Sequence, residues 1–130
     1  MADSDRQRPI RSYVLRTGRM TPAQRRAYAD NWQRWGLEYD DGLLDYAAVF
    51  GRTAPLVLEI GFGMGQSLVE MAAADPGSDF IGIEVHTPGV GKLMHTMQER
   101  GVHNVRAYCH DAVEVLRDCI PEASLDTVQV

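Results

Sequence analysis

The sequence predicts an α/β fold with a doubly wound parallel sheet, and three observations support it. From residue 55 onward, short apolar runs alternate with segments of helical pattern, an order typical of right-handed crossovers. A glycine-rich turn follows the first run. An acid closes each of the first three runs, Glu59, Glu84 and Asp111, at spacings of 25 (84 − 59) and 27 (111 − 84) residues. Because a strand and its crossover take about thirty residues, we expect these acids to lie level at the carboxyl edge of the sheet, where ligands bind.

The first part of the chain is expected to hold an extended arm and one helix. The arm covers residues 1–20. The helix is predicted to begin at Thr21, which can act as its N-cap and form a capping box with Gln24. It is expected to end at Gly36, since glycine commonly terminates helices. An acidic connection over residues 36–54 then leads into the sheet.

From residue 55 the expected elements alternate regularly. Apolar runs of four to six residues are too short for helices and are interpreted as strands. Strands are expected at 56–60, 80–83, 105–108 and 125–130, and helices at 45–50, 66–74, 90–100 and 111–120. The sequence therefore predicts two regions: the arm and helix with their connection over 1–54, and an incomplete Rossmann-like half-domain over 55–130 that stops at the fourth strand.

The charge is divided unevenly along the chain, whose net charge is −5. Residues 1–34 hold eight arginines and three aspartates, a net charge of +5. Residues 35–130 hold five basic and fifteen acidic residues, a net charge of −10. A basic arm on an acidic body indicates a polyanionic partner that the arm meets. A solvated terminus with no partner is the alternative interpretation.

Other features of the composition narrow the class of protein. No apolar run approaches the eighteen or so residues that a membrane-spanning helix needs. The polar, arginine-rich start does not resemble a secretory signal. Cys109 and Cys119 do not form a CxxC pair, which favours reduced thiols in a cytoplasmic protein.

The glycines of the turn, Gly61, Gly63 and Gly65, are predicted to adopt positive φ and to leave room for a ligand near the backbone. A tight turn without a ligand is the alternative. The pattern is GxGxG rather than the dinucleotide pattern GxGxxG. Glu59 lies two residues before the first glycine, and its charge favours a cationic cofactor such as S-adenosylmethionine over NAD. At the end of the second strand, Glu84 can accept hydrogen bonds from ribose hydroxyls.

The third acid has two candidate roles, and a metal site is not expected. Asp111 could accept a hydrogen bond from the adenine amino group or act as the N-cap of the following helix, and both roles remain open. The histidines are not at metal-ligand spacing, and neither a Ser-His-Asp nor a Cys-His arrangement is evident. The four histidines are His86, His95, His103 and His110.

Three stretches together resemble a known family. Residues 58–65, 82–91 and 109–114 are similar to the bacterial tRNA (guanine-N7-)-methyltransferases, which are class I S-adenosylmethionine-dependent enzymes, and the arm from Arg11 to Thr21 resembles their N-terminal region. The resemblance implies that Glu59, Glu84 and Asp111 contact S-adenosylmethionine. It also implies methylation of N7 of guanine 46 in the variable loop of tRNA.

The resemblance covers only the first half of such an enzyme. It implies that the catalytic aspartate lies beyond Val130, so we expect no catalytic residue here and no activity from the chain alone. It further implies that tRNA is bound by the arm and by the missing half. We expect a free edge on the fourth strand, which invites self-association. Two alternatives stay open: a truncated paralogue that binds cofactor or RNA without catalysis, and a fragment of an NAD-dependent oxidoreductase.

Overall fold

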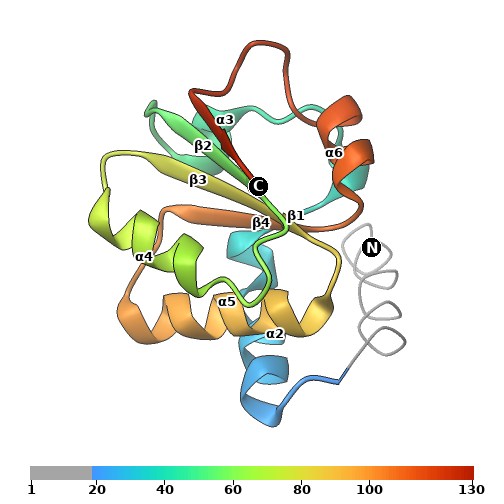
Figure 1. Cartoon of the computed structure of the whole chain (residues 1–130), viewed down its shortest axis with the longest axis vertical. Helices are drawn as coiled ribbons and strands as arrows, with labels where there is room; N and C mark the ends of the chain where they lie inside the picture. The colour runs from blue at the N-terminus through green and yellow to red at the C-terminus, as the bar shows by residue number, and fades with distance from the viewer. Residues whose placement is uncertain (1–18) are drawn as a thin grey trace.

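The computed structural model describes residues 19–130, which form a single parallel sheet covered by helices on both faces (Figure 1). The five strands lie in the order β1-β4-β3-β2-β5, and every pair of neighbours is parallel. They span Gly36–Leu37 (β1), Leu56–Ile60 (β2), Asp79–Glu84 (β3), Val105–Cys109 (β4) and Thr127–Gln129 (β5). The expected α/β class with a parallel sheet is confirmed, and each of the four predicted strands is present.

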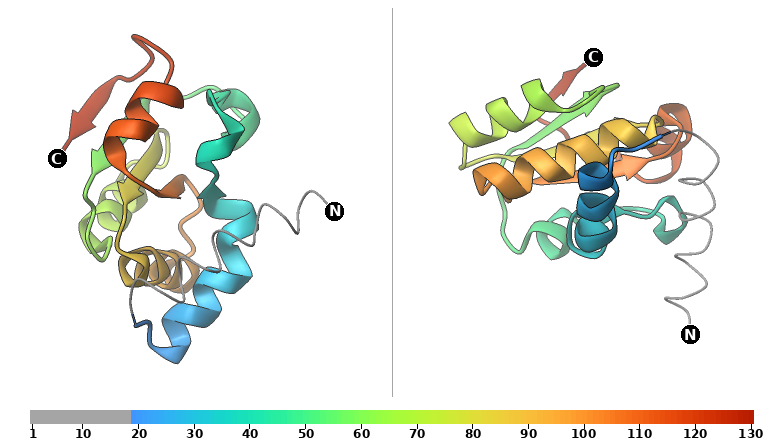
Figure 2. Two further views of the ribbon diagram at one scale, coloured as in Figure 1. Left: turned by 90° about the vertical axis from the view of Figure 1, so that its right-hand side faces the viewer. Right: turned by 90° about the horizontal axis from the view of Figure 1, so that it is seen from below.

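One face of the sheet is covered by three helices: α2 (Pro22–Trp35), α4 (Gln66–Ala74) and α5 (Thr87–Arg100). Helix α2 packs across α5, as the perpendicular views in Figure 2 show. The apolar residues of α5 that recur at helical spacing are all buried there: Val90, Leu93, Met94 and Met97. Packing of a helical apolar stripe against a strand face therefore forms this half of the core.

The opposite face is covered by shorter elements: the 3₁₀ helix η1 (Tyr39–Asp41), α3 (Tyr46–Phe50) and α6 (Ala112–Asp118). Leu58, Ile81, Ile83 and Tyr108 point to this side of the sheet and are fully or almost fully buried. Because side chains alternate along a strand, the same strands serve both cores. Burial on both faces explains why β2 and β3 are so apolar in sequence.

Local sequence signals account for most helix ends. Thr21 accepts a hydrogen bond from the Gln24 amide and its own amide donates to the Gln24 side chain, which confirms the capping box of α2. Asp45 caps α3. Gly101 ends α5 in the left-handed conformation, as expected. The predicted arm lies largely outside the described residues.

Two features of the sheet bear on the expectations. The acidic connection contributes a strand, β1, which pairs with β4 through Gly36 and Ala107 and which the sequence did not indicate. Strand β5 is at the other edge, where Val128 is exposed. Within residues 19–130, no helix has the length and apolarity needed to cross a bilayer.

Candidate functional site

The glycine turn between β2 and α4 is built by three residues in the left-handed region. Gly61, Gly63 and Gly65 have φ values of 72°, 64° and 84°, which confirms the expected positive φ. A side chain would be strained at each of these positions. A Cβ placed on Gly61 or Gly63 would meet nothing within 4 Å. The turn therefore presents bare backbone to open space.

Helix α5, which belongs to the next crossover, packs closely against this turn. A Cβ on Gly89 would lie 2.0 Å from the Gly63 carbonyl oxygen, and one on Gly65 would lie 2.7 Å from Leu93 Cδ1. In β3, a Cβ on Gly82 would lie 2.6 Å from the Phe62 ring. Sequence reasoning missed Gly82 and Gly89, although the Pro-Gly-Val-Gly start of α5 is an unusual way to begin a helix. These glycines allow neighbouring backbone and side chains to hold the turn in place.

Glu84, at the end of β3, fastens the turn to the sheet. Its Oε1 accepts a hydrogen bond of 2.8 Å from the Gly63 amide. Its Oε2 accepts bonds of 3.2 and 3.1 Å from the amides of Val85 and His86. A carboxylate has about four acceptor sites, so these contacts leave capacity for a further donor. The carboxylate thus organises the turn and remains able to receive a ligand hydroxyl.

Glu59 differs from Glu84 in having no partner in the described part of the chain. Its side chain makes no hydrogen bond or ion pair within the part of the chain that the structure describes. The residue is half-buried, and this burial raises the pKa of its carboxyl group. Burying a charge is unfavourable unless a counter-charge or donors compensate it. Glu59 is therefore a carboxylate whose surroundings favour the arrival of a cation.

The three acids are stepped rather than level, so the expectation of a single row is wrong in this respect. Glu59 pairs with Gly82, and Glu84 pairs with Cys109, two residues before Asp111. Each acid therefore lies two residues, or about 7 Å, further along the strand direction than the one before. The residue paired with each acid on the next strand comes 23 (82 − 59) and 25 (109 − 84) residues later, whereas the next acid comes 25 and 27 residues later. Glu59 and Glu84 still share the face covered by α4 and α5, because Gly82 and Glu84 are two residues apart.

Asp111 is exposed and caps α6, where its Oδ2 accepts a hydrogen bond of 3.0 Å from the Glu114 amide. The capping role is therefore confirmed, and the adenine contact stays a prediction. Next to it, the His110 ring stacks on Tyr39 with centroids 4.1 Å apart, and its Nε2 lies 2.6 Å from Glu114 Oε1. The N-terminal connection thus packs against the end of β4.

The histidines do not gather at this edge. His86 precedes α5, and His95 lies 3.6 Å from Glu99 along that helix. Among residues 19–130, no group of three or more His, Cys, Asp or Glu side chains could hold a metal ion. Cys109 is buried, and burial raises the pKa of its thiol to about 12. A thiol with this pKa is protonated at neutral pH and is not an activated nucleophile.

Two cavities lie elsewhere on the molecule. One of about 310 Å³ lies between the end of α2 and α3 and includes Trp32, Leu44 and Val49 in its lining. The other, of about 510 Å³, lies at the amino ends of β3 and β4 and is rich in arginine. Neither cavity is lined by the glycine turn or by Glu59, Glu84 or Asp111.

The family model Methyltransf_4, described as "Putative methyltransferase", matches residues 53–130. The tRNA (guanine-N(7)-)-methyltransferase of Alcanivorax borkumensis is 59% identical over 123 residues, covering 95% of this chain and 52% of that protein. The enzyme of the same name from Pseudoalteromonas atlantica is 58% identical, with coverage of 95% and 52%. The chain therefore spans about half the length of the curated relatives it matches.

A solved structure supports the fold. An antibiotic-related methyltransferase superposes with a TM-score of 0.53 at 17% identity, covering 71% of this chain and 45% of that one. At this identity the likeness concerns the arrangement of strands and helices. It agrees with the parallel sheet and its crossovers described above.

Proposed function

The chain belongs to the methyltransferase family whose model matches residues 53–130, and on that premise we propose that it is the S-adenosylmethionine-binding part of a tRNA (guanine-N7-)-methyltransferase. One observation carries the proposal. A turn of three left-handed glycines lies next to Glu59, a half-buried carboxylate without a partner among residues 19–130. That combination offers bare backbone and an uncompensated negative charge to one ligand.

The residues of this edge fit the chemistry of the proposed cofactor. S-adenosylmethionine carries a sulfonium and an ammonium group, and a desolvated carboxylate favours such cations. The pyrophosphate of NAD would instead meet repulsion from Glu59, and the turn does not have the dinucleotide spacing. The proposed assignments place the amino-acid end at Glu59 and the glycine backbone, the ribose at Glu84, and the adenine at Asp111. The stepped arrangement of the acids gives each of these parts its own level.

Two glutamates divide the work of binding. Glu84 is already engaged with the Gly63 amide, so it holds the turn in shape before a ligand arrives. Such preorganisation lowers the ordering cost of binding. Glu59 contributes the charge that selects a cation. Loss of Glu84 would therefore disturb both the ribose contact and the turn, whereas loss of Glu59 would remove charge alone.

The proposed chemistry needs few catalytic groups. When bound, S-adenosylmethionine supplies an electrophilic methyl group on a good leaving group. Guanine N7 has a free lone pair and no proton to remove, so alignment of the two reactants is the main requirement. Positioning alone can contribute up to about 7–11 kcal/mol. In this chain the glycine turn and the acids would orient the cofactor, and the guanine-binding wall would come from elsewhere in a longer protein.

The proposed substrate is tRNA, with the variable-loop guanine as the target. The relatives are named for tRNA methylation. On α2, Arg25, Arg26 and Arg34 are exposed and belong to the basic segment 1–34. We propose that this segment contacts tRNA phosphates and that the protein acts in the cytoplasm, where tRNA is available.

A binding titration tests the cofactor site. Calorimetry with S-adenosylhomocysteine should show binding to the parent chain and a loss of about 1.5–3 kcal/mol, or roughly 10- to 150-fold, in Glu84→Ala. Glu99→Ala is the matched control, because Glu99 is exposed near the end of α5, at the other end of the helix from Gly89, which packs against the turn. Tighter binding of NADH than of S-adenosylhomocysteine, or equal affinities for Glu84→Ala and the parent, would contradict the proposal.

Transfer of radiolabelled methyl groups to bulk tRNA tests whether the chain is active by itself. We expect background levels, because the chain spans about half the length of the relatives that are named for this activity. Robust turnover by the 130-residue chain would overturn that expectation.

Self-association is a separate proposal. The outer edge of β5 is unpaired within the described residues, and Val128 is exposed. Such an edge can pair with another chain. Light scattering should show dimers or larger species, and a monomer at all accessible concentrations would count against it.

A further inference from the structure

A second charged region lies at the opposite edge of the sheet, at the amino ends of β3 and β4. A cavity of about 510 Å³ opens there, and its charged lining residues are Arg52, Arg100, Arg106 and Asp79. Three arginines and one aspartate give this lining a net charge of +2. Residues 35–130 carry a net charge of −10, so the sign of the charge is locally reversed. This basic cavity requires an explanation of its own.

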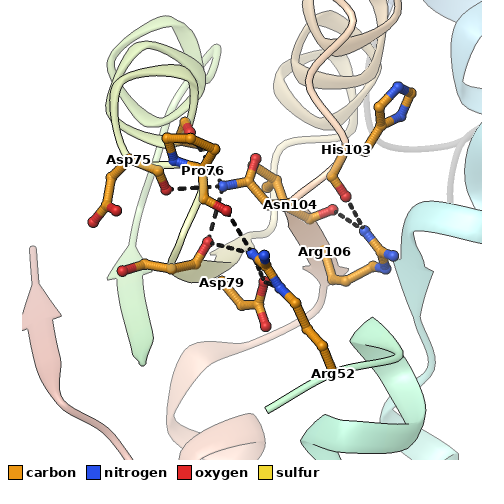
Figure 3. Close-up of polar contacts among 10 residues, drawn as sticks. Arg52, Asp75, Pro76, Asp79, His103, Asn104 and Arg106 are labelled. Atoms are coloured by element: carbon orange, nitrogen blue, oxygen red, sulfur yellow. Dashed lines mark hydrogen bonds and ion pairs between the residues drawn. The ribbon is translucent and has the colours of Figure 1, made fainter. Parts of the chain in front are cut away.

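The aspartate is neutralised within the protein. Asp79 is buried, with a side chain 2% exposed, and Arg52 contacts its Oδ1 through Nη2 at 2.7 Å and Nε at 3.1 Å (Figure 3). Arg52 also donates to the carbonyls of Pro76 and Ser78. Most of the hydrogen-bonding capacity of Arg52 is therefore used by the fold, and one arginine balances the one aspartate.

Arg106 is the central cation of the cavity, and no ion pair holds its guanidinium within residues 19–130. Its Nη1 donates to the carbonyls of His103 and Val105 at 2.7 and 2.9 Å (Figure 3). Its guanidinium lies over the Phe50 ring, 4.9 Å from the ring centroid. Its Nε and Nη2 make no hydrogen bond within residues 19–130. Burial lowers the pKa of this guanidinium, whereas the nearby charge of Asp79 raises it and the charge of Arg34 lowers it. Arg106 is thus a partly desolvated guanidinium, held through Nη1, with two nitrogens that no group of residues 19–130 engages.

Other groups extend the basic surface around it. Arg100, in the last turn of α5, is exposed and has no side-chain partner within the described part of the chain. His103 is exposed next to Trp35. The loop that carries these residues is held by Asn104, whose Nδ2 donates to three carbonyls, those of Ala72, Asp75 and Ser78. The cations therefore stand on a well-tied framework.

We propose that this basic cavity binds a phosphate group of an RNA backbone, with Arg106 and Arg100 as its main ligands. A guanidinium matches phosphate oxygens with two parallel donors, and a partly desolvated one binds more strongly than one in water. The choice of RNA rests on the proposed function. Strand β3 spans six residues, so the cavity lies about 16 Å from Glu84. The phosphate bound here positions the RNA at a distance from the methylated base.

Fluorescence anisotropy with labelled bulk tRNA tests the proposal on the 130-residue chain. Arg100→Gln and Arg106→Gln should each weaken binding about three- to fivefold, the size expected for a partly exposed ion pair. The slope of log K against log salt should fall by about one for each arginine removed. Arg117→Gln is the matched control: it removes the same charge from α6, outside the cavity, and should leave the affinity nearly unchanged.

Two further measurements make the outcome decisive. Arg100 serves no hydrogen bond in the described fold, so Arg100→Gln carries the test if Arg106→Gln fails to fold, which thermal melting would show. Affinity for S-adenosylhomocysteine should be unchanged in these variants, so failure of this site is distinguishable from failure of the cofactor site. Absence of tRNA binding by the parent chain, or equal losses in Arg100→Gln and Arg117→Gln, would overturn the proposal. Inorganic phosphate that binds the cavity without competing with tRNA would also overturn it.

Discussion

The amino and carboxyl ends of the parallel strands differ in whether a buried or half-buried carboxylate has a counter-charge. At the amino edge, Asp79 is 2% exposed and is held by the Arg52 guanidinium. At the carboxyl edge, Glu59 is half-buried and has no protein partner among residues 19–130. Both residues lie on strands of one sheet, two strands that are direct neighbours. The fold supplies a counter-charge in one case and omits it in the other.

This difference in pairing distinguishes an acid that stabilises the fold from an acid that is available to a ligand. A buried charge that serves only stability is expected to be paired, because an unpaired one costs free energy. Asp79 meets that expectation and joins the loops before β2 and β3. Glu59 does not, and it lies next to a turn with open space above its glycines. The lack of a counter-charge at Glu59 is therefore a better indicator of a ligand site than the presence of three acids.

The largest expected effect comes from breaking the paired edge. Arg52→Ala would remove the ion pair and both side-chain hydrogen bonds of the buried Asp79 carboxylate, and two further bonds to loop carbonyls. We expect the free energy of unfolding to fall by about 2–4 kcal/mol, measured by urea denaturation. The control Arg117→Ala breaks the exposed pair with Asp118 and should cost much less. Equal losses in both variants would contradict the distinction between the two edges.

A somewhat smaller effect is expected from crowding the glycine turn. The Cβ of Gly89→Ala would lie 2.0 Å from the Gly63 carbonyl oxygen, so either α5 or the turn must move. Overpacking of this kind costs about 1–3 kcal/mol. Affinity for S-adenosylhomocysteine should fall about tenfold for each 1.4 kcal/mol needed to restore the turn. Calorimetry and thermal melting together would measure both effects.

The matched control is Gly77→Ala, in the turn before β3. Its φ is not positive, and its Cβ would meet its nearest neighbour only at 3.9 Å. Stability and cofactor affinity should both stay close to those of the parent. Unchanged binding in Gly89→Ala would show that the contact with Gly63 does not shape the site.

Much of the fold was predictable because its signals are local. The capping box at Thr21, the glycine stop at Gly101 and the positive φ of Gly63 all depend on a few adjacent residues. The apolar runs set the strands for the same reason. Strand β1 escaped prediction because two residues, Gly36–Leu37, are too few to show an alternating pattern and are held by β4 alone.

The candidate site was only partly predictable because its key contacts are distant in sequence. The positions of Glu59 and Glu84 at strand ends follow from the periodicity, but their relative level depends on the exact length of the crossover. The hydrogen bond between Glu84 and the Gly63 amide joins residues 21 apart and has no sequence signal. Likewise, the close approach of Gly89 to the turn follows from helix packing, which a single sequence does not reveal.

Glu59→Gln tests the role of the unpaired acid, because it keeps the shape of the side chain and removes its charge. Affinity for S-adenosylhomocysteine, which retains the ammonium group, should fall about tenfold. The free energy of unfolding of the ligand-free chain should instead rise. Because burial raises the pKa of Glu59 in the folded chain, its charged form opposes folding.

The pH dependence of stability tests whether the charge of Glu59 opposes folding. Glu59 imposes no penalty below its unfolded pKa of about 4.5, and the penalty grows as the pH rises through the higher folded value. Glu59→Gln should therefore match the parent at acidic pH and exceed it slightly at neutral pH, by about a few tenths of a kcal/mol for a residue that remains partly exposed. Denaturation at several pH values would measure this, and a variant less stable than the parent at neutral pH would show that the charge is already compensated.

The smallest expected effect separates the two roles of Asp111. Serine is nearly as good an N-cap as aspartate, so Asp111→Ser should preserve the hydrogen bond to the Glu114 amide and most of the stability, whereas Asp111→Ala should lose about 1 kcal/mol. If the carboxylate also accepts a hydrogen bond from the cofactor, both variants should bind S-adenosylhomocysteine about two- to tenfold more weakly. If Asp111→Ser binds as tightly as the parent, the residue is a helix cap alone. In that case the adenine end is recognised by other groups at the end of β4, such as the stacked Tyr39 and His110 rings.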